Sequence, residues 1–367
     1  MSPKGDLVAF VDGEAHLCVV DRAGHEHVLG EAWRVYNLAW APRGDEIWVS
    51  GMRETRAVTL SGTSRRIFTS AVATEVHDVA PDGRALMLIG ESRGSIRAVA
   101  PGDSKERDVS WSALDVLRGL SADGKLVLFM RSGPSAYLRR TDTSAPAVRL
   151  GEGRPLALSD DGAWVLVSRP GTPATVVVMP TGAGESHSLE TGDVEIVGGI
   201  AGALSHDGKR VVYTGRRPGQ PSQVFVQDIE GGAPRLLTPG GEFWSSLTTR
   251  DGRSAVAVDK DRVLWLFPLD GSEPRRLPGP PETAVEEELG PWTNDGRGLL
   301  TTENGGRVSQ VFRRDLATGR RELIREIRPA DPIGLVGFGC ISAAEGRAYA
   351  CAYAHWLNSV YVVDGLR

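Results

Sequence analysis

The sequence has few cysteines, no long apolar run and little net charge, and each absence excludes a class of protein. Its three cysteines among 367 residues cannot form the framework of a disulfide-stapled domain, and they leave the redox compartment open. The longest weakly polar stretch, Pro332–Ala344, is too short to span a bilayer and contains three glycines. The net charge is −5, with 42 basic residues dispersed among 47 acidic ones, which argues against a nucleic-acid partner.

The beginning of the chain also lacks a secretory signal. Between Met1 and Gly13 the longest apolar run is Leu7–Val11, which is shorter than the apolar core of a signal peptide, and Pro3 and Gly5 stand before it. We therefore expect neither a cleaved leader nor insertion into a membrane.

Glycine and proline, by contrast, are in excess. The 45 Gly and 22 Pro make up about 18% of the residues, against a usual share of about 12%. The apolar fraction of 41% is high enough to form a large core, so the excess indicates many turns rather than disorder. Length alone favours two or three domains, but a search for internal repeats has to come first.

One short pattern recurs nine times along the chain. A small or hydroxyl residue is followed by two residues, the second of which is polar, and then by glycine and an apolar run, as in Ser121-Ala122-Asp123-Gly124. This order suits a type I turn closed by a glycine in the left-handed conformation, so each copy predicts a β-hairpin. The glycines are 38 to 50 residues apart and are Gly5, Gly44, Gly83, Gly124, Gly162, Gly208, Gly252, Gly296 and Gly346.

The apolar runs around these turns predict short strands. The clearest strands directly after a turn are Leu7–Val11, Glu46–Val49, Leu126–Met130, Trp164–Val167 and Arg210–Tyr213. A further apolar strand and an Arg-Leu strand follow, and one strand precedes each turn, which makes four antiparallel strands per unit. Four-stranded units of about 40–45 residues repeated in a line are typical of an all-β fold, the β-propeller.

The repeats leave no room for a linker, so residues 1–367 are predicted to form a single propeller domain. The first unit lacks its innermost strand because nothing precedes Ser2, and the last unit lacks its outermost strand. We favour eight blades, with nine as the alternative.

The turn pattern followed by an apolar strand, an acidic turn and Arg-Leu resembles the WD40-like (PD40, TolB-type) propeller repeats. Several segments are also similar to the C-terminal propeller region of bacterial eukaryotic-like serine/threonine protein kinases. They are Leu120–Met130, Tyr137–Asp142, Arg149–Gly153, Met179–Glu185, Phe225–Gly232, Asp315–Leu335 and Ser359–Arg367.

The motifs of a kinase domain itself do not occur in this sequence. The resemblance therefore implies the sensor or scaffold part of such a protein without the phosphoryl-transfer part. If Met1 is the natural start, we expect a cytoplasmic protein; if the chain is a fragment of a membrane-anchored kinase, an extracytoplasmic location is the alternative.

Three motifs suggest chemistry, and each has a simpler structural explanation. Gly90–Gly94 matches the G-x-S-x-G elbow of serine hydrolases, but between two strands of a blade it is a hairpin loop. His25 and His27 fall on one face of a short strand without a clear third metal ligand. Asp259–Asp261 and Asp160–Gly162 lack the ligand spacing of calcium loops. We expect no catalytic residue, no metal and no cofactor.

Tryptophan and arginine gather instead in connections that a propeller places on one rim. Because aromatic and Arg side chains around a concave mouth suit recognition, these connections are the predicted binding site for a protein, a peptide or a small molecule. The predicted site consists of Trp33, Arg53, Arg93, Trp111, Arg131, Arg216, Trp244, His355 and Trp356, with Arg217 beside them.

The predicted function is that of a non-catalytic binding or scaffold propeller, acting as a sensor or protein-interaction module. The alternative is a propeller hydrolase or lyase with its site at the channel mouth. Inner strands such as Val116–Gly119 and Val336–Gly339 are poor in convergent carboxylates and histidines, which favours binding over catalysis.

Overall fold

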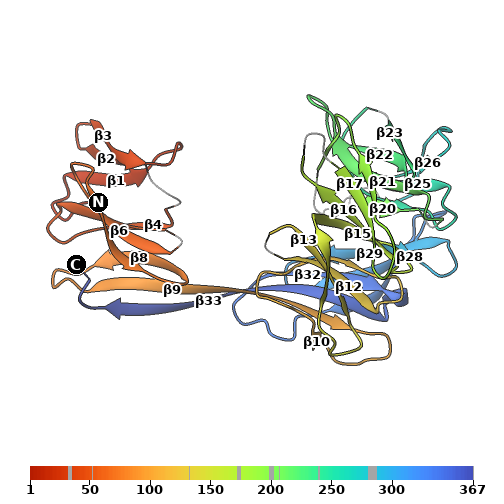
Figure 1. Cartoon of the computed structure of the whole chain (residues 1–367). Coiled ribbons are helices and arrows are strands. Elements are labelled where there is room, and N and C mark those ends of the chain that lie inside the picture. Colours follow the sequence, from red (N-terminus) through yellow and green to blue (C-terminus); the bar gives the residue numbers. More distant parts are fainter. Residues whose placement is uncertain are drawn as a thin grey trace. The chain divides into compact units, whose positions relative to one another are not determined.

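The computed structural model describes residues 1–31, 35–51, 53–131, 133–171, 175–197, 202–205, 207–238, 240–279 and 287–366. Regular structure in these ranges is β-strand apart from one 3-10 turn, η1 (Ala344–Gly346), and the strands form eight sheets (Figure 1). The chain divides into two compact units. Unit 1 contains Met1–Arg93 and Trp356–Arg367, and unit 2 contains Gly94–His355.

Unit 1 contains three sheets. The first is β1 (Leu7–Val11), β2 (His16–Asp21) and β3 (Glu26–Glu31), and the second is β4 (Asn37–Trp40), β5 (Glu46–Ser50), β6 (Glu54–Thr59) and β7 (Ser64–Thr69). The third contains β8 (Ala73–Val79) with parts of β9 (Ala85–Val99) and β33 (Ala348–Val363). Trp40 and Ile47 belong to the core between the first two sheets, and Trp48 and Met87 to the core between the second and third.

Five sheets of unit 2 are each formed by consecutive strands. The first is β11 (Val116–Leu120), β12 (Leu126–Arg131), β13 (Ser135–Arg140) and β14 (Val148–Glu152); the second is β15 (Arg154–Leu158), β16 (Trp164–Arg169), β17 (Thr175–Pro180) and β18 (His187–Glu190). The third is β19 (Glu195–Ile196), β20 (Gly202–Leu204), β21 (Arg210–Arg216), β22 (Gln223–Asp228) and β23 (Gly231–Leu236). The fourth is β24 (Phe243–Thr248), β25 (Ser254–Asp259), β26 (Leu264–Pro268) and β27 (Arg275–Arg276); the fifth is β28 (Glu287–Trp292), β29 (Gly298–Asn304), β30 (Ser309–Asp315) and β31 (Arg321–Ile327).

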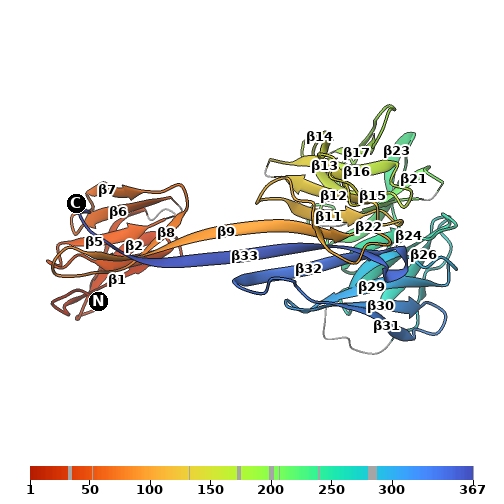
Figure 2. The same ribbon diagram turned by 90° about the horizontal axis from the view of Figure 1, so that it is seen from below.

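The sixth sheet of unit 2 belongs to the same five-stranded sheet as β8 of unit 1, so the total is eight, and it combines strands that are far apart in sequence. Its order is β10 (Arg107–Asp108), β9, β33 and β32 (Leu335–Ala343), so that β9 and β33 lie side by side (Figure 2). The inner strands β11, β15, β20, β24, β28 and β32 each contact the next, and β32 contacts β11. Unit 2 is therefore a closed ring of six sheets. The all-β propeller fold predicted from the sequence is confirmed, whereas the predicted count of eight blades, with nine as the alternative, is not.

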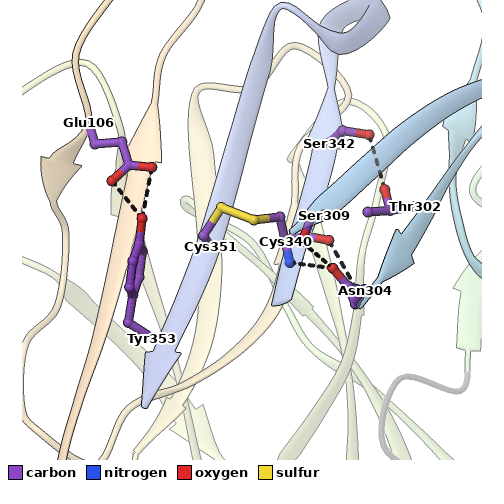
Figure 3. Close-up of a disulfide and its surroundings, with 8 residues drawn as sticks. All are labelled: Glu106, Thr302, Asn304, Ser309, Cys340, Ser342, Cys351 and Tyr353. Atoms are coloured by element: carbon purple, nitrogen blue, oxygen red, sulfur yellow. Dashed lines mark hydrogen bonds between the residues drawn. A yellow bond between two sulfur atoms is a disulfide. The ribbon is translucent and has the colours of Figure 1, made fainter. Parts of the chain in front are cut away.

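Side-chain hydrogen bonds tie the sixth sheet to the fifth (Figure 3). The side-chain oxygen of Asn304 on β29 accepts from the N–H of Cys340 on β32 at 2.9 Å, and from the hydroxyl of Ser309 at 2.6 Å. The hydroxyls of Thr302 and Ser342 lie 3.5 Å apart across the same pair of sheets. We call the sixth sheet, formed by β10, β9, β33 and β32, the closing sheet.

The closing sheet also contains a disulfide between Cys340 and Cys351, which are directly opposite each other on β32 and β33 (Figure 3). Further along β33, the hydroxyl of Tyr353 donates to the carboxylate of Glu106 at 2.8 Å. Burial and this carboxylate raise the pKa of Tyr353. The remaining cysteine, Cys18 in unit 1, is buried and forms no disulfide, and burial raises its pKa to about 11.

The nine glycine turns lead directly into strands, as their sequence pattern predicts. At the fourth turn the Ser121 hydroxyl donates to Asp123 at 2.6 Å and accepts from the N–H of Leu126 at 2.9 Å, while Gly124 has φ +76°. The same hydroxyl–aspartate pair recurs at Ser159, Ser205, Thr249 and Thr293. The hydroxyl residue therefore organises the turn, a role that the sequence reasoning did not assign to it.

The structure differs from the predicted single ring in how its repeats are grouped. The third turn leads into β9 and the ninth into β33, and these two strands share one sheet, so nine turns produce eight sheets. The boundary between the two units falls within both strands, after Arg93 and after His355. Residues predicted as one domain over 1–367 are thus divided between unit 1 and the closed ring of unit 2.

The Gly90–Gly94 segment is not the hairpin loop predicted from its sequence. It lies inside the continuous strand β9, and neither glycine has a positive φ. A Cβ on Gly90 would come within 2.7 Å of the side chains of Trp356 and Asn358, and one on Gly94 would meet the backbone oxygen of Ala113 at 2.7 Å. These glycines permit close packing within a strand rather than a turn.

The hydroxyl–aspartate turns should make stability depend on acid pH. The hydroxyl donors are the main cause that lowers the pKa of Asp207, Asp251 and Asp295. A carboxyl group whose pKa is lower in the folded than in the unfolded protein stabilises the fold. This stabilisation is fully present above the pKa of the unfolded state, about 3.9, and is lost as pH falls through the pKa of the folded state.

We expect Thr249→Val to cost about 1 kcal/mol of unfolding free energy at pH 7. Urea unfolding between pH 7 and pH 3 should show the difference from wild type shrinking at the acid end; a constant difference would contradict this explanation.

Candidate functional site

The strand register identifies one end of the unit 2 ring at which inner strands begin. Val116 at the start of β11 pairs with Met130 near the end of β12, and Leu335 at the start of β32 pairs with His355. Because the sheets repeat the same strand order, these starts lie on one side of the ring. We call this end the mouth.

Exposed apolar side chains gather where the chain enters β11 and β32, which are neighbouring inner strands. Trp111 is 49% exposed and Val336 is 64% exposed. Single exposed apolar residues are common on protein surfaces, whereas a group of them on adjacent connections is uncommon. The group consists of Trp111, Leu114, Val116, Ile333 and Val336. We call it the mouth surface.

The connection that carries Trp111 is held by a buried carboxylate. Asp115 is 8% exposed and accepts hydrogen bonds from the backbone N–H of Trp111 at 2.6 Å and of Ser112 at 2.8 Å. Its other oxygen accepts from the Ser112 hydroxyl at 2.7 Å. The N–H of Gly94 donates to the backbone oxygen of Ala113 at 2.9 Å. The exposed tryptophan therefore stands on a loop whose backbone is fixed on both sides.

The connection that carries Ile333 is held by a histidine. The ring nitrogen Nε2 of His355 lies 3.1 Å from the backbone oxygen of Asp331, and the Asp331 carboxylate accepts from the N–H of Ile333 at 3.2 Å. The His355 ring is buried and stacks on Tyr353 with 6.0 Å between centroids. His355, predicted as a binding residue, is thus placed beneath the mouth surface, where it positions this connection.

The other predicted site residues of unit 2 differ in how free their side chains are. Arg131 is exposed at the end of β12. Arg216 forms an ion pair with Glu195 at 2.9 Å. Arg217 pairs with Asp193 at 3.1 Å and lies over the ring of Phe225. Trp244 is a residue of β24, but its side chain lies outside the described part of the structure.

The remaining predicted site residues do not belong to unit 2. Arg53, Arg93 and Trp356 lie in unit 1 and are exposed, with Trp356 48% exposed on β33. Trp33 lies outside the described residues. The predicted set is therefore divided between two units, and Arg93, His355 and Trp356 are on long strands rather than in the predicted connections.

Sequence reasoning missed most of the mouth surface. Leu114, Val116, Ile333 and Val336 are ordinary apolar residues, and nothing in their local sequence separates an exposed position from a buried one. The available signal was their place in the connections into two inner strands that ring closure makes neighbours. Trp111 was identified because its residue type is itself informative at binding surfaces.

Other groups that attracted attention in the sequence have local partners. The His25 ring pairs with Asp21 at 2.9 Å, in the turn between β2 and β3. Asp259 accepts from the indole N–H of Trp265 at 2.8 Å, and Asp261 pairs with Lys260. Among the described residues, no three His, Cys, Asp or Glu side chains are grouped to hold a metal ion. That part of the chain also contains no helix long and apolar enough to cross a membrane.

Comparison with known proteins supports the fold. No family model matches the chain. Tricorn protease homolog 1 of Streptomyces coelicolor is 24% identical over 75% of this chain, which spans 24% of that protein's length. A TolB-type protein of Agrobacterium tumefaciens is similar in structure, with a TM-score of 0.52 and 20% identity, over 73% of this chain and 99% of the other. An oligogalacturonate lyase in complex with manganese has a TM-score of 0.43 and 15% identity over 75% of this chain and 76% of the other. At 20% identity the likeness to the TolB-type structure concerns the fold alone, and that fold is the TolB-type β-propeller.

Proposed function

We propose that the chain is a non-catalytic binding module, and that the mouth surface of unit 2 holds a peptide segment of a partner protein. The observation that supports this is the group of five exposed apolar side chains on connections whose backbones are fixed by Asp115 and His355. A preformed apolar surface loses little conformational entropy on binding, and an exposed tryptophan is the residue type that most often dominates such contacts. Arg131, exposed beside the start of β11, supplies a cation at its border.

The binding test compares two tryptophans of nearly equal exposure. Peptides are selected from a random library on the immobilised wild-type chain, and their affinities are then measured by calorimetry for Trp111→Ala and Trp356→Ala. We expect Trp111→Ala to weaken binding at least about tenfold, because truncating a central aromatic residue commonly costs 2 kcal/mol or more. Trp356→Ala, in unit 1, serves as the matched control and should bind as wild type does. Unchanged affinity in Trp111→Ala would remove the mouth surface as the binding site.

The similarity of several segments to kinase-associated propellers supports a more specific role. We propose that the module acts as a sensor related to those attached to bacterial kinases. An in-frame kinase domain encoded upstream of this propeller in the source genome would support this role, whereas an isolated gene would contradict it.

The disulfide favours one of the two predicted compartments. Disulfides persist in oxidising compartments and are rare in the cytoplasm. A buried Cys340–Cys351 bridge in the closing sheet therefore supports an extracytoplasmic location. Fractionation of the source cells with an antibody against unit 2 would test this, and recovery in the cytoplasmic fraction would contradict it.

A further inference from the structure

Two arginines on neighbouring inner strands of unit 2 have no acidic partner among the residues that the structure describes. Arg118 lies within β11 and Arg154 begins β15, and these two strands contact each other. In the described part of the chain, no carboxylate forms an ion pair with either guanidinium, although Arg140 on the same sheet as Arg118 pairs with Asp142 at 2.6 Å. The nearby Asp115 is occupied by the loop of Trp111 and Ser112.

The environment of Arg118 is unfavourable for a positive charge. Its Nε atom is buried and has no hydrogen-bond acceptor. Burial, and secondly the charge of Arg154, lower the pKa of the Arg118 side chain. A partly buried cation without a partner costs folding free energy, and a second cation beside it adds to that cost.

The backbone at Arg118 has an irregularity that also occurs on the inner strands β15, β24, β28 and β32. A register shift interrupts the pairing of β11 with β12 between Leu117 and Gly119, on either side of Arg118. A Cβ on Gly119 would lie 3.6 Å from the Cβ atoms of Leu128 and Leu158, which is an ordinary packing distance between β11 and its neighbours. Bulges of this kind reorient a side chain relative to the sheet.

We propose that Arg118 and Arg154 together bind an anionic group, a carboxylate or a phosphate, of the ligand that enters through the mouth. A guanidinium presents paired N–H donors that match the oxygen atoms of either group. An anion bound by both arginines would supply the acceptor that Arg118 Nε lacks among the described residues. The bound anion also removes the repulsion between the two cations. This inference rests on the proposed function, because it adds an anionic group to a ligand whose apolar part contacts the mouth surface.

The experiment uses two simple anions as probes on the full chain. Calorimetric titrations with citrate and with inorganic phosphate, in chloride buffer of matched ionic strength, are made for wild type, Arg118→Gln, Arg154→Gln and Arg140→Gln. We expect saturable binding to wild type and to the Arg140→Gln control, and at least about tenfold weaker binding to the other two variants. The probe that binds more tightly identifies the group as carboxylate or phosphate.

A second measurement protects the test against a purely structural role for these arginines. Without added anion, Arg118→Gln should unfold at an equal or higher urea concentration than wild type, because the substitution removes an unpaired charge. A clear loss of stability, no saturable binding of either probe to wild type, or equal binding to Arg118→Gln would each overturn the proposal. Failure of the peptide test with Trp111→Ala would leave these titrations unaffected, so the two ideas fail separately.

Discussion

Replacing Ile96 by Ala should destabilise unit 2 by about 3 kcal/mol, one of the largest effects expected for a single substitution in this chain. Ile96 lies on β9 in the closing sheet and is fully buried. It packs in one cluster with Ala350 of β33 and Phe129 of the adjacent sheet. Its side chain therefore joins a strand from the first third of the sequence to one from the end, and both to the neighbouring sheet.

The effect is expected to be large because Ile96→Ala would create a cavity between the closing sheet and the adjacent sheet, where the ring closes. Deleting buried methyl and methylene groups loses their transfer free energy and leaves a void that the surrounding sheets fill only partly. Urea unfolding followed by tryptophan fluorescence measures the change. Val148→Ala on the outer strand β14 is the control, since Val148 is exposed and its truncation should change stability by no more than about 0.5 kcal/mol. Similar losses for the two variants would show that the closing sheet is not part of the cooperative core.

The local parts of this fold could be predicted from the sequence because their causes are local. The strand Leu7–Val11 was predicted with the bounds that the structure has, and Leu126–Met130 is one residue short of β12. A turn pattern that ends in glycine, followed by an apolar run, is sufficient to predict a hairpin, and both can be identified in a short stretch of sequence. The same reasoning identified all nine turns.

The grouping of the repeats could not be predicted in this way. The pairing of β9, which ends at Val99, with β33, which begins at Ala348, joins distant parts of the sequence, and no short-range pattern specifies which edge strands meet. Gly90 and Gly94 made β9 resemble two strands with a loop, although their role is close packing against Trp356 and Ala113. Every conclusion that depended on that loop, including the predicted place of Arg93 on a single rim, changed with it.

The candidate site was predicted only where residue type is itself informative. Trp111 and Arg131 were identified, whereas Val116 and Val336 became a site only through the contact between β11 and β32. Arg118 was visible in the sequence as the one charged residue of an apolar strand. Its significance depends on the lack of a partner across neighbouring strands, and that is a property of the tertiary structure.

Removing the Cys340–Cys351 disulfide should lower the unfolding free energy of unit 2 by about 3 kcal/mol. The bridge joins residues separated by 11 positions, and closing a loop of this size restricts the unfolded chain by about that amount. Both cysteines are buried and lie opposite each other in the closing sheet, so the alanine pair Cys340→Ala/Cys351→Ala removes the bridge without leaving a buried polar group. Urea unfolding of this variant, compared with wild type with and without reductant, measures the effect.

The controls separate the bridge from the third cysteine. Cys18 is a buried thiol whose raised pKa keeps it protonated at neutral pH, so reductant should act on wild type only through the bridge. The alanine pair should accordingly be insensitive to reductant, and alkylation of the unfolded, unreduced wild type should modify one cysteine. Three modified cysteines would contradict the bridge itself. A bridge that is present but costs nothing to remove would contradict the expected stabilisation.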